Sequence, residues 1–305
     1  MPHLAPEQFV RSRPDLQRAW TQAESLDYTR WLATSHYENF HVASFLLPKR
    51  IHQDFYNVYS FCRWADDLGD EIGEKSESLR LLAWWQEELD RMYGGEASHP
   101  VFVALRGTVA KFDIPEQPFA DLIRAFVGDQ TVSRYANWPE LYDYCRFSAN
   151  PVGHLVLYLC GYRDEKRQRL SDFTCTALQM ANHWQDVSVD LLKDRIYLPQ
   201  DVMARHGCTD ADLFAGRETP AVVATMQEVV EHAHQFFENG LPLAGMVNRR
   251  LSIDLDLFSR GGMRVLDKIE QQGYRVLHRR PAVGKLERVG ILLRTLARVA
   301  FSRVA

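Results

Sequence analysis

The segment from Tyr59 to Asp70 most constrains this chain, because it sets acidic side chains in an otherwise apolar sequence. In a helix, four of its polar side chains would share one stripe, since they are spaced by four, three and four residues. They are Tyr59, Arg63, Asp66 and Asp70. The remaining circumference is aromatic or aliphatic, which predicts a buried helix. Buried carboxylates need cations, so a buried helix here predicts a cation site. The simpler alternative is that the polar stripe is a solvated helix face.

A second acidic stripe follows 120 residues further along the chain. Its spacings of three, four and four again define one face of an apolar helix, formed by Gln179, Asn182, Asp186 and Asp190. Two buried helices that face one another with two carboxylates each could hold hard divalent cations and leave positions for a phosphate. The prediction depends on the matched pair and not on either stripe alone. The predicted metal ligands are Asp66, Asp70, Asp186 and Asp190.

Composition bounds the class of protein. The chain has 305 residues, of which 46% are hydrophobic and 25% charged, an ordinary composition for a globular protein with a large core. A net charge of −4 argues against a dedicated nucleic-acid-binding protein. Frequent helix boundaries without alternating strand patterns predict a single all-α domain with a central cavity. The N-terminus lacks a secretory signal pattern and the five cysteines lack metal-ligand spacing, so we expect a cytoplasmic protein.

The two acidic motifs resemble those of the squalene/phytoene synthase family, the head-to-head prenyl synthases. The family's first motif corresponds here to Cys62-Arg63 followed by Asp66 and Asp70. Its second corresponds to the stripe from Gln179 to Asp190 and closes with Arg195, Tyr197, Leu198 and Pro199. The resemblance extends from about Tyr37 to Arg279. It implies an isoprenoid-synthase-like helical bundle in which two or three Mg2+ ions bind a prenyl diphosphate.

The resemblance also implies roles for individual side chains. The metal ligands, Arg63, Tyr59 and Tyr144 would be catalytic, with the two tyrosines stabilising positive charge on the substrate. Arg63, Arg195 and Tyr197 would stabilise the leaving diphosphate. Among the remaining substrate-binding candidates, Gln179, Asn182 and Arg279 match family positions. Asn39 stands where relatives carry a serine that touches the diphosphate, and its amide could still bind a phosphate. Asn39 could equally be an ordinary helix cap.

Three further substrate-binding candidates depart from the family pattern. Ser148 and Asn150 replace apolar or small residues beside Pro151, where a kinked helix would line the prenyl channel. Their polar groups predict either local bonding to the backbone at the kink or a polar spot that holds water. Gly262 stands where relatives have a tyrosine, which predicts close packing or a cavity.

These departures resemble the branch of the family that occurs in bacterial hopanoid gene clusters. That branch ionises presqualene diphosphate and lets water capture the cation, giving hydroxysqualene. The resemblance implies no nicotinamide cofactor, and as functional partners a presqualene diphosphate synthase and a flavin-dependent dehydroxylase. The main alternative is a squalene or phytoene synthase that condenses two prenyl diphosphates, such as farnesyl diphosphate.

Two minor alternatives remain. One is a non-catalytic relative that acts as an assembly factor, although such proteins tend to lose the carboxylates that this chain keeps. The other is a di-iron oxidase, because Glu38-x-x-His41 and Glu231-x-x-His234 have the spacing used in di-iron bundles. Such a site would also need a glutamate from each of two other helices.

The C-terminal segment 278–305 follows a predicted catalytic domain of residues 1–277. It contains seven Lys and Arg residues and one Glu, interleaved with apolar residues at helical spacing. This pattern predicts a basic amphipathic tail that binds an anionic membrane surface, which would place the protein peripherally at the inner face of the membrane. The alternative is a C-terminal helix that docks on the core.

Overall fold

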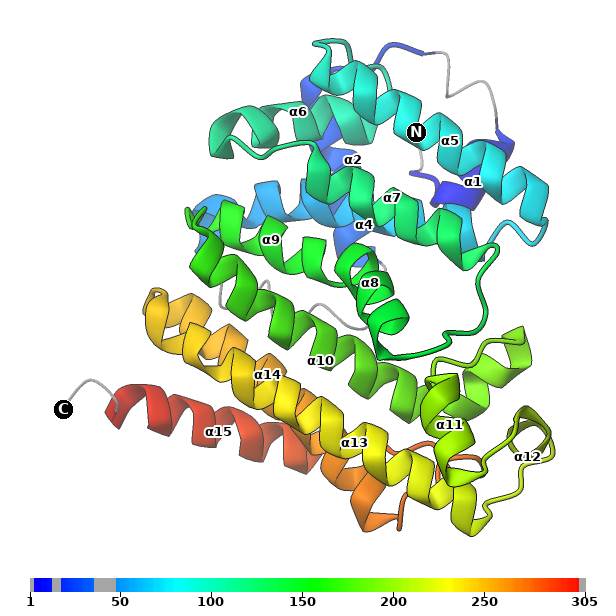
Figure 1. Ribbon diagram of the computed structural model, residues 1–305. Helices are drawn as coiled ribbons and strands as arrows, with labels where there is room; N and C mark the ends of the chain where they lie inside the picture. The colour runs from blue at the N-terminus through cyan, green and yellow to red at the C-terminus, as the bar shows by residue number, and fades with distance from the viewer. Residues whose placement is uncertain (1–2, 13–17, 36–47, 302–305) are drawn as a thin grey trace. The chain divides into compact units, whose positions relative to one another are not determined.

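The computed structural model describes residues 3–12, 18–35 and 48–301, without the side chains of the last three residues. Asn39 and the Glu38-x-x-His41 pair lie outside the described residues. Within these ranges every regular element is a helix (Figure 1), and the one β-bridge pairs Arg134 with Ile196. The all-α prediction is confirmed. No helix of the described ranges is long and apolar enough to cross a membrane.

The chain divides into two compact units, which are described separately. The first contains Met1–Thr131 and Pro151–Arg163, and the second contains Val132–Asn150 and Asp164–Ala305. The predicted division into residues 1–277 and 278–305 stays a prediction.

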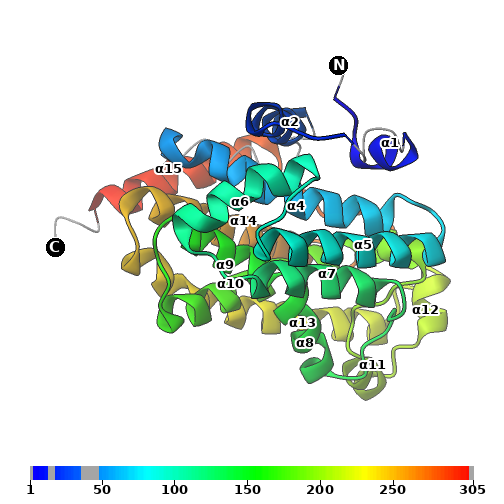
Figure 2. The same ribbon diagram turned by 90° about the horizontal axis from the view of Figure 1, so that it is seen from above.

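The first unit is built around one helix. Its elements are α1 (Pro6–Arg11), α2 (Gln22–Ser35), a 3-10 turn (Lys49–Ile51), α4 (His52–Asp70), α5 (Lys75–Tyr93), α6 (Pro100–Phe112), α7 (Gln117–Asp129) and most of α9 (Asn150–Leu159). Helix α4 packs against α2, α5, α6 and α7, and Figure 2 shows α2 on one side of it and α5 and α7 on the other. The indole of Trp64 stacks on that of Trp85, with centroids 5.0 Å apart. The predicted burial of the first acidic helix is thus observed.

A buried polar network fixes α4 against its neighbours. The Asn57 side-chain amide donates to the Ala104 carbonyl at 3.2 Å and to Thr108 Oγ1 at 3.0 Å. Its oxygen accepts from Thr29 Oγ1 at 2.7 Å. Because a buried polar group is costly unless its bonds are made, this network specifies one position of α4 relative to α2 and α6.

Four long helices dominate the second unit. Its elements are α8 (Trp138–Ser148), α10 (Glu165–Asp190), a 3-10 turn (Leu191–Lys193), α11 (Gln200–His206), α12 (Asp210–Phe214), α13 (Pro220–Gly240), a second 3-10 turn (Leu241–Met246), α14 (Arg249–Gln271) and α15 (Lys285–Phe301). Helix α10 packs against α8, α13 and α14, and α15 runs along α14 (Figure 1). Trp184 of α10 and Phe237 of α13 are fully buried in this core.

Gly262 of α14 provides a close approach between helices and not a cavity. A Cβ atom there would collide with the Phe237 ring and press on Leu178. The side chains of α10 and α13 therefore fill the space that a larger residue at position 262 would take. Of the two expectations at Gly262, close packing is observed and the cavity is wrong.

The tail helix α15 docks on α14 through polar contacts. The buried Asp256 accepts from Thr295 Oγ1 at 2.6 Å and from Arg298 Nη1 at 2.7 Å. Nearer the start of α15, Glu287 pairs with Arg264 at 2.5 Å and with Lys268 at 2.7 Å. These bonds come from one face of α15 and leave the opposite face exposed.

Asp254 of α14 is a carboxyl group buried in the second unit. The residue is 2% exposed, and neither carboxyl oxygen has a hydrogen-bond partner among the described residues. Burial raises the pKa of Asp254 to about 8, because the charged form loses its hydration.

Substitution of Asp254 by asparagine should remove a pH dependence of stability. An unfolded aspartate has a pKa of about 4, so between about pH 4 and pH 8 the folded state holds a proton that the unfolded state has lost. The contribution of Asp254 to stability therefore falls as pH rises, by up to about 1.4 kcal/mol per pH unit. We expect the unfolding free energy of Asp254→Asn, relative to wild type, to increase from pH 5 to pH 8 in urea titrations. The exposed control Asp143→Asn should show no such trend, and a difference for Asp254→Asn that is constant with pH would contradict the assignment.

Candidate active site

The first acidic motif occupies the last two turns of α4. The Arg63 guanidinium lies 2.6 Å from Asp67 Oδ1 and 3.8 Å from Asp66 Oδ2. The Asp67 side chain is 6% exposed, that of Asp66 is 48% exposed, and Asp70 is exposed at the end of the helix. The sequence stripe missed Asp67, which takes the shortest contact of Arg63 because a buried carboxylate most needs a cation.

Negative charge is concentrated at this end of α4. Burial raises the pKa of Asp66 to about 6, the Arg63 guanidinium opposes the shift, and the nearby carboxylates of Asp70 and Asp67 add to it. Burial also raises the pKa of Asp67 to about 6, against the influence of Arg63. The carboxyl end of a helix itself favours positive charge. The group therefore suits a divalent cation.

Tyr59 lies one turn before Arg63 and is partly buried. Burial raises the pKa of its hydroxyl, and the nearby Asp67 and Asp66 carboxylates add to the shift while Arg63 opposes it. The structure thus brings together all four residues of the first predicted stripe, on one end of one helix.

The second motif occupies the last three turns of α10, and its centre is His183. The Gln179 amide nitrogen lies 3.1 Å from His183 Nε2, so the amide donates and the neutral ring carries its proton on Nδ1. That Nδ1 faces Asp190 Oδ2 at 3.8 Å. Burial lowers the pKa of His183, although Asp190 and Asp186 oppose the shift. Sequence reasoning missed His183, yet its spacing of four from Gln179 and seven from Asp190 places it on the same stripe.

Aromatic rings cover the second motif. The His183 ring stacks on Tyr197, with centroids 3.5 Å apart and planes at 12°. Tyr144 of α8 lies 6.0 Å from His183 and 5.6 Å from Tyr197, centroid to centroid. Tyr135 lies 5.6 Å from Tyr197 and completes the cluster. Two predicted site residues, Tyr144 and Tyr197, are therefore in one ring cluster beside Gln179 and Asp190.

A small pocket opens beside this cluster. Its polar lining comes from His183, Asp190, Arg195 and Tyr197, and its apolar lining is formed by Trp184, Val187, Ile196 and Leu198. Asp190 Oδ2 is buried and has no hydrogen-bond partner among the described residues. An orphaned carboxylate oxygen in a pocket suits a cation or a hydrogen-bond donor.

The loop that carries Arg195 is held in place by Arg134. The Arg134 guanidinium donates to the Asp194 carbonyl at 2.6 Å and pairs with Asp194 Oδ1 at 2.8 Å. Asp194 adopts a left-handed conformation, and the Arg195 backbone N–H donates to the Asp190 carbonyl at 3.0 Å. The loop therefore folds back on the end of α10 and brings Arg195 to the pocket.

The other carboxylate of the second motif is paired with a guanidinium. Arg280, in the segment after α14, binds both oxygens of Asp186, through Nε and, at 3.1 Å, through Nη2. The neighbouring Gln185 amide donates to the Pro281 carbonyl at 2.6 Å. Arg279, the predicted phosphate-binding residue, is exposed, and its carbonyl accepts from the Gln272 amide at 3.0 Å. The side chain that reaches the motif is thus that of Arg280, a residue that sequence reasoning did not single out.

The remaining predicted residues lie away from these contacts or form others. Asn182 is exposed. Helix α8 ends at Ser148 and α9 begins at Asn150, so Ala149 breaks the helix where a kink was expected. Asn150 Oδ1 accepts from Thr176 Oγ1 of α10 at 3.0 Å, while Ser148 Oγ is buried without a partner among the described residues. Asn150 thus bonds to another helix, which neither expectation for the kink foresaw.

Comparisons with known proteins place this arrangement in a family. Residues 33–287 match the sequence profile described as squalene/phytoene synthase. The chain belongs to the squalene/phytoene synthase family. The match covers both acidic motifs, so the resemblance seen in the sequence is confirmed.

Three relatives illustrate the range of similarity. A hydroxysqualene synthase from Rhodopseudomonas palustris is 32% identical over 236 residues, covering 76% of this chain and 80% of that protein. A chloroplastic phytoene synthase 2 from Solanum lycopersicum is 28% identical over 272 residues, covering 86% and 87%. The crystal structure of squalene synthase HpnC from Alicyclobacillus acidocaldarius is 43% identical, with a TM-score of 0.80, covering 83% and 96%. The isoprenoid-synthase-like helical fold is confirmed by this similarity.

Cation binding at the first motif should weaken in acid. A cation must displace the proton from Asp66, whose pKa is about 6, so affinity should fall by about four-fold between pH 7.5 and pH 5.5. Free Mn2+, used as the probe and counted by electron paramagnetic resonance, measures this directly. Asp66→Asn should bind more weakly and lose the pH dependence, whereas Asp186→Asn should keep it. Equal wild-type affinity at both pH values would contradict the role of Asp66 as a ligand.

Proposed function

We propose that this family member ionises presqualene diphosphate, releases diphosphate and lets water capture the rearranged cation, giving hydroxysqualene. The observation that carries the proposal is the similarity to a hydroxysqualene synthase, 32% identical over 76% of this chain. Both acidic motifs of the family are present, with four aspartates at the predicted spacing. We also propose that no nicotinamide cofactor takes part, and that a presqualene diphosphate synthase and a flavin-dependent dehydroxylase act before and after this enzyme.

The donor set of the two motifs fits Mg2+. Oxygen ligands are those that Mg2+ prefers, and Asp190 Oδ2 is an acceptor without a hydrogen-bond donor in the part of the chain that the structure describes. Asp66, Asp70, Asp186 and Asp190 would hold the ions. When bound, Mg2+ would neutralise the charge that develops on the leaving diphosphate.

The chain's own side chains support the other requirements of such a reaction. Arg63, Arg195 and Arg280 already lie beside the acidic motifs, and their guanidinium groups could bind diphosphate oxygens. The stacked rings of Tyr197 and His183, with Tyr144 beside them, offer π faces to a cation. His183 is neutral at physiological pH because burial lowers its pKa, so it adds no opposing positive charge. The buried hydroxyl of Ser148 could bond a water molecule.

A second candidate is a squalene or phytoene synthase that condenses two prenyl diphosphates. It is supported by the phytoene synthase from Solanum lycopersicum, which matches over 86% of this chain, and by the HpnC structure, which is named a squalene synthase. The two candidates differ in substrate and in whether water enters the product.

Incubation with Mg2+ in 18O-labelled water distinguishes the two candidates. With presqualene diphosphate we expect hydroxysqualene carrying the label, at a rate unchanged by NADPH, identified by mass spectrometry. Asp66→Asn and Asp186→Asn should lower turnover by at least about 100-fold, because each removes a ligand of the Mg2+ ions that would stabilise the charge on the leaving diphosphate.

The exposed Asp143→Asn serves as the control and should keep wild-type turnover. Squalene or phytoene formed directly from farnesyl diphosphate would overturn the hydroxysqualene proposal and favour the second candidate.

We further propose that α15 holds the enzyme at an anionic membrane surface. The face of α15 opposite its docking contacts carries large apolar side chains that are exposed, namely Leu286, Val289, Leu292, Leu293 and Leu296. Lys285, Arg288 and Arg294 are exposed on the same helix and suit acidic lipid headgroups. The bonds from Asp256 and Glu287 fix the helix on α14 with its apolar face outward.

Sedimentation with vesicles that contain anionic lipid tests this surface. The double variant Leu286→Glu and Leu293→Glu should bind at least 10-fold more weakly, because each leucine would otherwise bury apolar area worth about 1.5–3 kcal/mol. Wild-type binding should weaken with salt. Leu192→Glu, on a leucine 86% exposed compared with 88% for Leu286, is the matched control. If the double variant and the control sediment alike, α15 is not the binding surface.

A further inference from the structure

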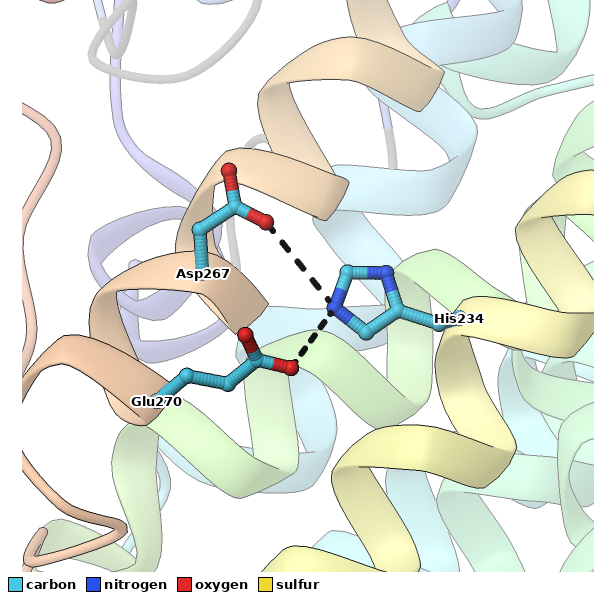
Figure 3. A group of neighbouring side chains, drawn as sticks. All are labelled: His234, Asp267 and Glu270. Carbon is cyan, nitrogen blue, oxygen red and sulfur yellow. Dashed lines mark ion pairs between the residues drawn. The ribbon is translucent and has the colours of Figure 1, made fainter.

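A second group of metal-ligating side chains lies on α13 and α14 of the second unit. His234 comes from α13, and Asp267 and Glu270 come from α14, where a spacing of three places them on one face. Figure 3 shows the imidazole pointing between the two carboxylates. His234 belongs to the Glu231-x-x-His234 pair of the sequence, which neither acidic motif uses.

The distances within the group are close to those between the ligand atoms of a bound metal ion. His234 Nε2 lies 3.5 Å from Glu270 Oε1 and 3.9 Å from Asp267 Oδ1 (Figure 3). One atom from each residue lies within 4.8 Å of the others. Ligand atoms about 2.0–2.2 Å from one metal ion lie about 3–3.5 Å apart. The two distances from His234 need to shorten by about 1 Å or less, and the distance between the two carboxylates by less than about 2 Å. The side chains are 21–43% exposed, which leaves room for that movement.

The surroundings orient the ligands and supply negative charge. Asp267 Oδ2 contacts the Arg264 guanidinium at 3.4 Å, and Oδ1 faces the imidazole. In metal sites, a hydrogen-bond partner of this kind commonly orients the ligand. Arg264 makes its shorter contact, at 2.5 Å, with Glu287. Burial raises the pKa of the Tyr274 hydroxyl, and the charges of Glu270 and Glu231 add to the shift. The charges of Glu270 and Glu231 thus both act on Tyr274.

The donor atoms select a class of metal. An imidazole nitrogen with carboxylate oxygens suits Zn2+, Co2+ or Ni2+, whereas Mg2+ prefers oxygen ligands alone. Three protein ligands leave at least one coordination position for water. We propose that His234, Asp267 and Glu270 form a binding site for one divalent transition-metal ion, Zn2+ or a similar ion, that cross-links α13 and α14. This site is independent of the proposed reaction.

The competing interpretation is a simple ion pair. A protonated His234 between two carboxylates would give the same contacts without a metal. The two interpretations differ in the visible absorption of added Co2+. If His234 is a ligand, coordination by its nitrogen changes that absorption, and the change is lost when His234 is replaced. Binding to the folded state alone would also raise the melting temperature as the metal concentration rises.

Titration of the full chain with Co2+, in excess Mg2+ to occupy the acidic motifs, tests the proposal. We expect one ion per chain with a visible absorption band that is shifted and more intense than that of Co2+ in water. Zn2+ should displace it, and the melting temperature should rise with Zn2+. His234→Ala should abolish the band, and the near-isosteric Asp267→Asn and Glu270→Gln should each weaken binding at least about 10-fold. Circular dichroism verifies that each variant is folded.

His206→Gln is the matched control. His206 is also a partly buried histidine, 27% exposed, and it pairs with Glu228 at 2.7 Å without forming such a group. This variant should bind Co2+ as wild type does. Binding that is unchanged in His234→Ala, Asp267→Asn and Glu270→Gln would overturn the proposal. If wild type gives no such band, the three side chains form an ion pair without a metal, and the proposal is overturned.

Discussion

The cost of burying carboxylates at the ends of two core helices governs this structure. Helices α4 and α10 are surrounded by apolar side chains, yet each carries aspartates in its final turns. A buried charge is tolerated only with a counter-charge and satisfied hydrogen bonds. In both places an arginine supplies that charge: Arg63 for Asp67 and Arg280 for Asp186. At each helix end one aspartate is thus paired with an arginine, a pairing that a cation and an anionic ligand could jointly replace.

The two units hold these two helices in place differently. In the first, an amide network centred on Asn57 fixes the position of α4. In the second, aromatic rings perform that task, because Tyr197 stacks on His183 and thereby holds the loop after α10 against the helix. A neutral, buried imidazole can accept from Gln179 and still face Asp190, whereas a charged one donates from both nitrogens and could not accept from that amide.

Contacts between distant segments determine which residue of a motif is engaged. Gly262 predicted either close packing or a cavity, and the side chains of Phe237 and Leu178 fill the space, as expected of a densely packed interior. Asn150 bonds to Thr176 of α10, which leaves Ser148 Oγ as the buried hydroxyl without a partner among the described residues. Of these three positions, Ser148 is therefore the one whose buried polar group is left to bind another molecule.

The sequence by itself determined the helical class, the burial of α4 and α10 and the grouping of the aspartates, since these follow from the 3.6-residue period along single helices. It also contained the signal for His183, on the same stripe as Gln179 and Asp190. Only the tertiary structure decided that Arg280 meets Asp186, 94 residues away, and that His234 meets Asp267 and Glu270. Such pairs depend on how helices and loops pack, and spacing along one helix carries no information about partners on another.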